Sequence, residues 1–202
     1  MIDFKKEKMR ICFFASHGGS NMQAILDAIQ SGLLNAEASL LITNNSQSYA
    51  MERAKTVGMS AYHLSGKTNP DNLNSAIIEK LHFHKANIIV LAGYMKKLDD
   101  SIIDFVEGRV LNIHPALLPK FGGEGMYGMN VHNAVISAGE KVSGASVHLV
   151  NNHYDEGRIL NQMKCEVLPD DTPEELAARV LKIEHIIYTD TLIKITIGEI
   201  II

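Results

Sequence analysis

The 202-residue sequence contains no tryptophan, only two cysteines and few aromatic residues, which make up 6% of the chain. Cys12 and Cys165 lie far apart and form no CxxC motif, so we expect reduced core thiols in a cytoplasmic protein. The scarcity of aromatic side chains leaves little material for the stacking platforms that bind single-stranded nucleic acid. Apolar runs are also short, and none approaches the roughly 20 residues of a membrane-spanning helix.

The sequence also has no excess of basic residues, because 19 lysines and arginines stand against 23 acidic residues, giving a net charge of −4. Binding nucleic acid requires a basic face that neutralises phosphates, so this balance argues against a nucleic-acid partner. The basic N-terminus precedes an apolar run, residues 11–15, that is shorter than the roughly 7–15 residues of a signal-peptide core. A chain that is 46% hydrophobic and 21% charged is interpreted as one globular domain over residues 1–202.

Apolar patterns alternate along the chain between strand-like and helix-like periods. This alternation predicts an α/β fold, an open twisted sheet that is mostly parallel and has helices on both faces. The last two strand-like segments are joined by a turn-rich stretch, which indicates an antiparallel pair in the C-terminal half. The expected strands cover residues 11–15, 39–43, 61–64, 87–91, 109–114, 146–150 and 159–167, and the expected helices begin near residues 21, 48, 69, 101, 130 and 172.

Capping signals mark the starts of three of these helices. Ser48 is a candidate N-cap, and Asn69 followed by Pro70 would supply a cap with proline at the first helical position. The sequence Thr-Pro-Glu-Glu at 172–175 has the spacing of a capping box. Residues 115–129 are rich in glycine and proline and predict a long surface loop, and such loops are usually functional or disordered.

Asn112 and His114 are the most informative polar residues, because they flank Ile113 at the end of an expected parallel strand. Side chains alternate along a strand, so both lie on one face with Cα atoms roughly 6.6 Å apart. Pro115 ends the strand at its carboxyl end, where open α/β sheets bind ligands. An amide donor and an imidazole suit oxyanion stabilisation and proton transfer. From spacing alone, a hydrogen-bonded polar strand end explains the pair equally well.

A short loop at residues 16–21, with the sequence SHGGSN, follows the first expected strand and opens the first expected helix. Small residues, free backbone N–H groups and the helix dipole favour phosphate binding there. The loop matches neither GxGxxG nor the P-loop, which disfavours dinucleotides and nucleoside triphosphates. The alternative is a tight strand-to-helix turn with an N-cap.

Asp155 lies in an acidic, glycine-containing turn between the last two expected strands, where a solvated turn is the simpler interpretation. It gains a function only if it faces His114. The histidines and cysteines lack zinc-like spacing, so no metal site is predicted. Nucleophilic catalysis is not predicted either, because the sequence has no GxSxG and neither cysteine lies in an electropositive turn.

Six segments, in order along nearly the whole chain, resemble the phosphoribosylglycinamide formyltransferases, folate-dependent enzymes of purine biosynthesis. NIHPxLLP is specific for the formyltransferase superfamily, whereas SxGGSN and the late Glu-His pair narrow the resemblance to the glycinamide ribonucleotide branch. The segments are residues 16–25, 90–95, 111–121, 144–148, 154–157 and 184–185.

This resemblance implies a formyltransferase-type, Rossmann-like catalytic domain that moves a formyl group from 10-formyltetrahydrofolate, the cosubstrate, to the amine of glycinamide ribonucleotide. The catalytic trio maps onto Asn112, His114 and Asp155, with the first two stabilising a tetrahedral oxyanion and the third orienting the imidazole. The ribonucleotide site maps onto Gly19, Ser20, Asn21 and Glu184, and the folate site onto Met95, Lys96, Lys97, Leu98, Asn112, Asn151, Asn152, His153 and Tyr154.

Three positions depart from familiar members of that family. Lys96 stands where an arginine is common, which keeps the charge but loses a planar bidentate donor. Residues 69–74 lack an arginine that some members place near the folate, and the loop at 122–129 is longer and richer in glycine.

Two alternatives accompany this interpretation. One is another 10-formyltetrahydrofolate enzyme, either a methionyl-tRNA formyltransferase or a formyltetrahydrofolate deformylase. Each carries a further domain for which we expect 202 residues to leave no room. The other is a nucleotide- or folate-binding module without catalysis, which has no need of Asn112, His114 and Asp155 together. The sequence is compatible with a monomer or a homodimer.

Overall fold

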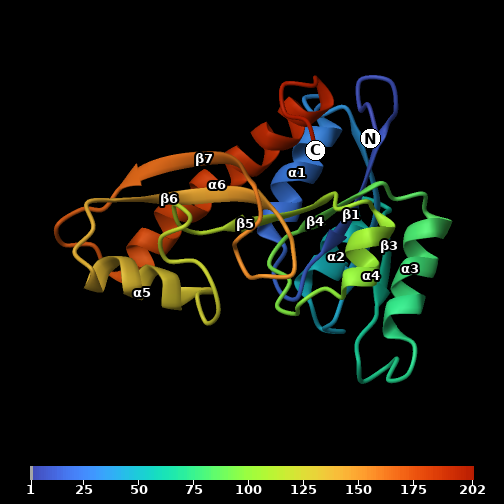
Figure 1. Ribbon diagram of the computed structural model, residues 1–202, viewed down its shortest axis with the longest axis horizontal. Coiled ribbons are helices and arrows are strands. Elements are labelled where there is room, and N and C mark those ends of the chain that lie inside the picture. The colour runs from blue at the N-terminus through green and yellow to red at the C-terminus, as the bar shows by residue number, and fades with distance from the viewer. Residues whose placement is uncertain (1) are drawn as a thin grey trace.

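A seven-stranded sheet forms the centre of the computed structural model, which describes residues 2–202 (Figure 1). Its strand order is β3-β2-β1-β4-β5-β6-β7; β1 to β5 pair in parallel, and β6 and β7 are antiparallel. The mostly parallel sheet with an antiparallel C-terminal pair is therefore confirmed. The strands are β1 (Met9–Phe14), β2 (Ala36–Thr43), β3 (Ser60–His63), β4 (Ile88–Leu91), β5 (Val110–His114), β6 (Val142–Leu149) and β7 (Ile159–Glu166).

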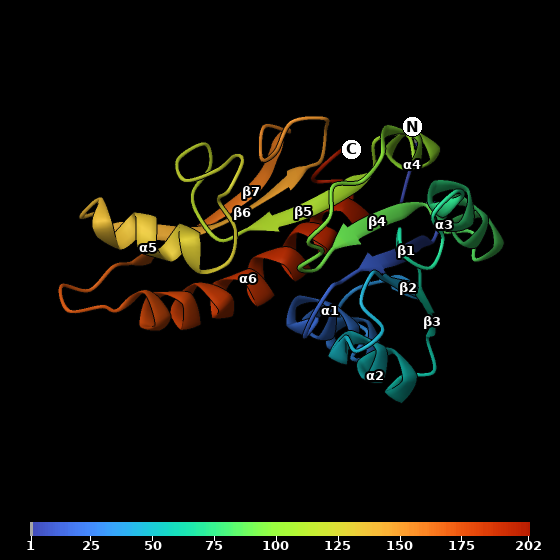
Figure 2. The ribbon, with the colours of Figure 1, turned by 90° about the horizontal axis from the view of Figure 1, so that it is seen from below.

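Helices cover both faces of this sheet and bury two apolar clusters against it (Figure 2). Strand β4 is buried at all four positions, as expected for a parallel strand with helices on either side. The first cluster lies beneath α1 (Ser20–Gln30), α2 (Tyr49–Thr56), α5 (Met129–Ser137) and α6 (Pro173–Thr196), and the second beneath α3 (Leu73–Phe83) and α4 (Asp100–Phe105).

The capping signals had different outcomes. The Thr172 hydroxyl accepts from the Glu175 N–H, and the Glu175 carboxylate accepts from the Thr172 N–H, so the capping box of α6 is confirmed. Ser48 is the N-cap of α2, yet its hydroxyl donates to the His17 carbonyl instead of capping the helix. The start predicted at Asn69 is wrong, because α3 begins at Leu73 after an Asn72 cap.

Helix α3 does not start at Asn69 because the backbone of Asn69 belongs to a turn that begins at Ser65. The Asn69 N–H donates to the Ser65 carbonyl at 2.8 Å, and the Thr68 hydroxyl donates to the Asn69 side chain at 3.0 Å. Strand β6 also begins earlier than predicted, at Val142, because its ladder with β7 starts with the pair Val142 and Glu166.

The loop predicted at 115–129 is confirmed over residues 115–128, between β5 and α5. Both cysteines are free; Cys12 is buried in β1, whereas Cys165 on β7 is only half-buried, so the prediction of two core thiols is right for Cys12 alone. Within residues 2–202, no helix combines the length and apolar character that crossing a membrane requires.

Candidate active site

The carboxyl end of β5 carries Asn112 and His114 on the same face, while Leu111 and Ile113 pack into the core on the other. Strand β6 runs antiparallel beside it and places His148 opposite Asn112 and Ser146 opposite His114. Directly opposed residues of an antiparallel pair share a face of the sheet. The end of β5 is therefore flanked by further polar side chains.

His114 is buried, with 3% of its surface exposed, and its ring contacts two groups. Its Nε2 lies 2.7 Å from the Phe121 carbonyl, to which only an N–H can donate. Its Nδ1 lies 3.4 Å from Oδ2 of Asp155. Burial lowers the pKa of His114 below its ordinary value, and the Asp155 charge opposes that effect. The structure thus brings together the two residues whose proximity the sequence could not establish.

Asp155 lies between β6 and β7 with a positive φ of 59°, a conformation that aspartate tolerates better than most residues. Its Oδ2 accepts from the Gly123 N–H at 3.0 Å, and its Oδ1 lies 3.4 Å from Nε2 of His148. Burial alone would raise the pKa of Asp155, but the contacts with His114 and the Gly123 N–H hold it below its usual value. The carboxylate is therefore kept ionised beside the imidazole.

His148 is a site residue that sequence reasoning missed. Its Nε2 lies 3.1 Å from Nδ2 of Asn112, and its Nδ1 lies 2.8 Å from the Leu149 carbonyl. The available signal was that His148 and Ser146 alternate on a strand next to Asn112 and His114. Using that signal required the strand register, which no local pattern supplies.

The predicted phosphate loop lies at the start of α1, where Gly19 is the N-cap with a φ of 64°. A Cβ on Gly19 would come within 2.8 Å of the Ala50 Cβ, so this position needs glycine for both its conformation and its close packing. The sequence places small residues where the N–H groups of a helix start are free, the usual geometry of an anion site.

Asn21 and Glu184, which are 163 residues apart, meet at this loop. Nδ2 of Asn21 donates to Oε2 of Glu184 at 2.8 Å, and burial raises the pKa of Glu184 above its ordinary value. Oδ1 of Asn21 is buried and has no hydrogen-bond partner within residues 2–202. Helix α6 thus places a carboxylate beside the loop.

Ser16 connects the phosphate loop to the segment that follows β4. Its hydroxyl donates to Asn44 at 2.6 Å and accepts from the Met95 N–H at 2.8 Å. Its own N–H donates to the Gly93 carbonyl at 3.1 Å. These bonds join the predicted phosphate-binding and folate-binding segments at one edge of the sheet, where the carboxyl ends of the parallel strands meet.

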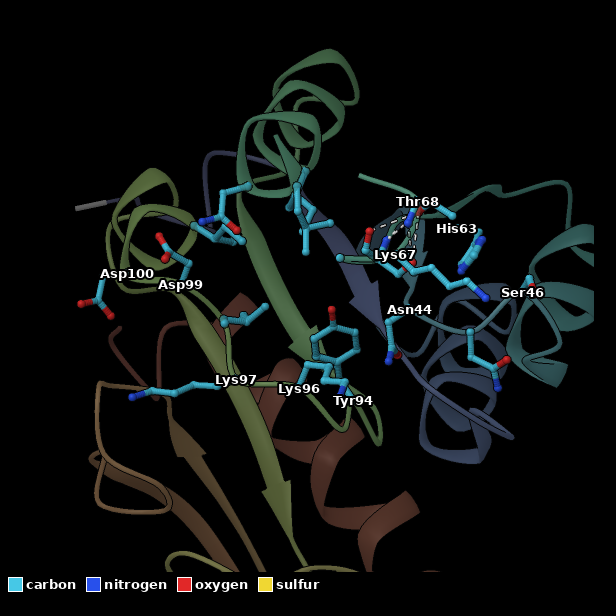
Figure 3. A pocket seen from close by; sticks show the side chains of 18 residues that line it. Asn44, Ser46, His63, Lys67, Thr68, Tyr94, Lys96, Lys97, Asp99 and Asp100 are labelled. Carbon is cyan, nitrogen blue, oxygen red and sulfur yellow. Dashed lines mark hydrogen bonds between the residues drawn. The ribbon is translucent and has the colours of Figure 1, made fainter. Parts of the chain in front are cut away.

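An open hollow of about 1180 Å³ lies beside the predicted folate segment (Figure 3). Lys67, Lys96 and Lys97 line it together with Tyr94, whose pKa burial raises to about 12. Asp99 and Asp100 also line the hollow, together with several apolar side chains. The apolar residues that line it are Leu73, Ile77, Leu98 and Ile102. The catalytic candidates do not line this hollow, so it adjoins the end of β5 only through the segment after β4.

The remaining folate candidates lie on the turn before Asp155. Asn151, Asn152 and His153 are exposed, and Oδ1 of Asn151 accepts from the His153 N–H at 2.9 Å. Nζ of Lys97 lies 5.9 Å from the centre of the Tyr154 ring, which brings this turn next to the segment at 95–98. Within the described part of the chain, no three His, Cys, Asp or Glu side chains lie close enough to hold a metal ion.

Comparisons with known proteins agree with this geometry. A profile of the Formyl transferase family matches residues 9–192. The phosphoribosylglycinamide formyltransferase of Haemophilus influenzae is 36% identical over 89% of this chain and 83% of its own. The chloroplastic phosphoribosylglycinamide formyltransferase of Vigna unguiculata is 40% identical over 91% of this chain, which spans only 59% of that relative's length.

The fold agrees as well. The crystal structure of glycinamide ribonucleotide transformylase 1 from Symbiobacterium toebii superposes with a TM-score of 0.89 at 33% identity, covering 96% of this chain and 91% of that one. The chain therefore belongs to the formyl transferase family, on the branch of the phosphoribosylglycinamide formyltransferases.

Proposed function

We propose that this chain transfers a formyl group from 10-formyltetrahydrofolate to the amine of glycinamide ribonucleotide, a step of purine biosynthesis. The observation that carries the proposal is the convergence of Asn112, His114 and Asp155 at the carboxyl end of β5. An amide donor, a buried imidazole and a carboxylate are the groups that acyl transfer to an amine needs. They lie at the same sheet edge as Asn21 and Glu184, the candidates for the acceptor site.

The proposed reaction begins with attack of the substrate amine on the formyl carbon, forming a C–N bond and a tetrahedral oxyanion. The N–H groups of Asn112 and His114 stabilise that oxyanion. For this, the Nε2–H of His114 leaves the Phe121 carbonyl and donates to the oxyanion. Collapse breaks the bond between the formyl carbon and N10 of the folate. The proton lost by the amine passes to N10, and Asp155 holds His114 in orientation during this transfer.

The donor fits the segment at 95–98, the turn at 151–154 and the adjoining hollow. A folate combines flat aromatic rings with a glutamate tail that carries two carboxylates. The hollow is lined by apolar side chains and by Lys67, Lys96 and Lys97, whose ammonium groups suit an anionic tail. Lys96 supplies this charge at the position where the family resemblance leads us to expect an arginine.

The acceptor fits the helix start at Gly19, Ser20 and Asn21. Backbone N–H groups there can hold the phosphate of the ribonucleotide, and the Glu184 carboxylate can receive the glycine amine. The buried Oδ1 of Asn21 is an acceptor that a donor of the substrate would satisfy. In this proposal residues 1–202 act as one catalytic domain in the cytoplasm, a location that cell fractionation tests.

A formyl-transfer assay with three acceptors tests the proposed function. Purified protein and 10-formyltetrahydrofolate are incubated with glycinamide ribonucleotide, with methionyl-tRNA or with water alone, and tetrahydrofolate release is followed. We expect turnover with the ribonucleotide only. Faster turnover with methionyl-tRNA or water would replace the proposal with one of the two related activities. Binding without turnover on any acceptor would indicate a binding module.

A further inference from the structure

His148 is a buried imidazole to which the proposed reaction assigns no step. It lies on β6 directly opposite Asn112, and only 2% of its surface is exposed. Its ring contacts the Leu149 carbonyl, the Asn112 amide and the Asp155 carboxylate. One imidazole therefore contacts two members of the proposed catalytic trio, Asn112 and Asp155.

The hydrogen bonds of His148 define its tautomer. Nδ1 lies 2.8 Å from the Leu149 carbonyl, and because a carbonyl only accepts, Nδ1 carries the proton. In the neutral ring Nε2 keeps a lone pair, which accepts from Nδ2 of Asn112 at 3.1 Å. The Asn112 amide is thus held with its nitrogen toward His148, and its second N–H stays free for a ligand. A freely turning amide would instead expose its oxygen to the oxyanion part of the time.

The contact with Asp155 is of a different kind. Nε2 of His148 lies 3.4 Å from Oδ1, a distance too long for a strong hydrogen bond. The other oxygen, Oδ2, faces Nδ1 of His114 and the N–H of Gly123. His148 is therefore only in van der Waals contact with the carboxylate, and its proposed role includes no hydrogen bond to Asp155.

We propose that His148 is a positioning residue which, as the neutral Nδ1-protonated tautomer, orients the Asn112 amide. This inference rests on the proposed formyl transfer, since Asn112, the residue that His148 holds, is proposed to act there. His148 acts through its neighbours, so its loss reduces kcat and leaves the KM of both substrates nearly unchanged.

Two substitutions distinguish the roles of the two ring nitrogens of His148. In His148→Gln the amide oxygen replaces Nε2 as the acceptor for Asn112, whereas His148→Asn keeps a donor for the Leu149 carbonyl and loses that acceptor. We expect kcat to stay within about threefold for His148→Gln and to fall on the order of 10–100-fold for His148→Asn, as expected when an oxyanion donor is misaligned. Equal losses of kcat in the two variants, or losses mainly in KM, would overturn the proposal. His82→Asn, at an exposed position on α3, is the control.

A double-mutant cycle and a substrate-free measurement complete the test. If His148 acts through Asn112, His148→Asn adds less than about a threefold loss in an Asn112→Ala background; fully multiplicative losses contradict this. The ¹⁵N spectrum of the imidazole rings reads the tautomer in the unliganded wild-type protein. We expect the Nδ1–H form for His148, and the Nε2–H form would overturn the proposal. Because this spectrum needs no turnover, a wild-type protein inactive in formyl transfer would refute the proposed function separately.

Discussion

At the scale of single residues, the site depends on a few polar groups held at buried positions by partners from distant parts of the chain. His114 is restrained by the Phe121 carbonyl and by Asp155, and Asn112 by His148. Burying such groups is costly unless their hydrogen bonds are satisfied, so each contact both stabilises the fold and fixes a rotamer. The same contacts therefore determine what each group can do chemically.

Removing either proposed oxyanion donor should lower activity without unfolding the protein. We expect Asn112→Ala and His114→Ala each to lower kcat/KM by on the order of 10²-fold, about 3 kcal/mol of transition-state stabilisation. Steady-state kinetics with both substrates measures this, and circular dichroism melting checks the fold. The control is His82→Ala, at an exposed histidine on α3. Near-wild-type turnover in both test variants would remove them from the catalytic assignment.

The charge of Asp155 should be visible in the titration of His114. Burial lowers the pKa of His114 and the Asp155 carboxylate raises it, so removing the carboxylate charge in Asp155→Asn should lower that pKa further. Below about pH 6.5 the histidine at position 114 is protonated in the unfolded chain but stays neutral in the folded chain. The variant should therefore lose more stability than the wild type as the pH falls from about 6.5 to 5.

NMR titration of the His114 ring proton measures the pKa directly. Asp171→Asn, which removes a carboxylate paired with Arg179 at the start of α6, is the control for a general charge effect. A pKa of His114 that rises in Asp155→Asn, or shifts equally in both variants, would contradict the assigned cause.

At the scale of secondary structure elements, α6 is hydrogen-bonded to the last two parallel strands, β4 and β5. The Tyr188 hydroxyl is completely buried and lies 3.1 Å from the Leu91 carbonyl on β4 and 2.8 Å from the Leu111 carbonyl on β5. Its single proton is shared between two carbonyls close to the end of β5 that carries Asn112 and His114. Tyr188→Phe should lower the free energy of unfolding by about 1–2 kcal/mol, because a buried acceptor loses its donor.

Urea unfolding followed by circular dichroism measures this loss. Tyr127→Phe, at a tyrosine 57% exposed in the loop before α5, is the matched control and should change stability by less than about 0.5 kcal/mol. An unchanged midpoint in Tyr188→Phe would show that the hydroxyl contributes nothing to the anchoring of α6.

The elements that the sequence predicted well are those whose signals are local. The start of α6 follows from two side chains three residues apart, and the face shared by Asn112 and His114 follows from strand alternation alone. The start of α3 failed because Asn69 and Asn72 are both acceptable caps, and a turn around Ser65 decides between them. The early start of β6 depends on pairing with β7, which no local pattern contains.

The same distinction applies to the candidate site. Asp155 was tied to His114 only by family resemblance, and His148 was given no role, because both placements depend on the register of β5 against β6. A slip of that register by one residue would turn His148 away from Asn112. Local spacing could therefore supply two of the polar groups at the end of β5, and tertiary pairing supplied the others.

At the scale of the whole molecule, the acidic balance and a phosphate-bearing substrate have to be reconciled. The net charge is −4, yet the phosphate would bind at a helix start whose donors are backbone N–H groups. Backbone N–H dipoles act at short range and need no basic surface. A protein with a net negative charge can therefore still bind an anion at this site. Lys67, Lys96 and Lys97 line the hollow proposed for the folate tail.

This separation predicts different salt dependences for the two substrates. Raising the salt from about 50 to 200 mM shortens the Debye length, which is about 10 Å at the midpoint of this range. The shorter screening length weakens the attraction between exposed lysines and the carboxylates of the folate. It also weakens the repulsion of both anionic substrates by the acidic surface. The KM of the folate donor should rise roughly twofold to fivefold, whereas the KM of the ribonucleotide should change by less than about twofold. Steady-state kinetics at a series of salt concentrations measures both slopes in one protein.

Lys67→Gln should flatten the salt dependence of the donor KM, while Lys55→Gln, on α2 outside the hollow, serves as the control. A ribonucleotide slope as steep as that of the donor would mean that cationic side chains, and not the helix start, hold its phosphate.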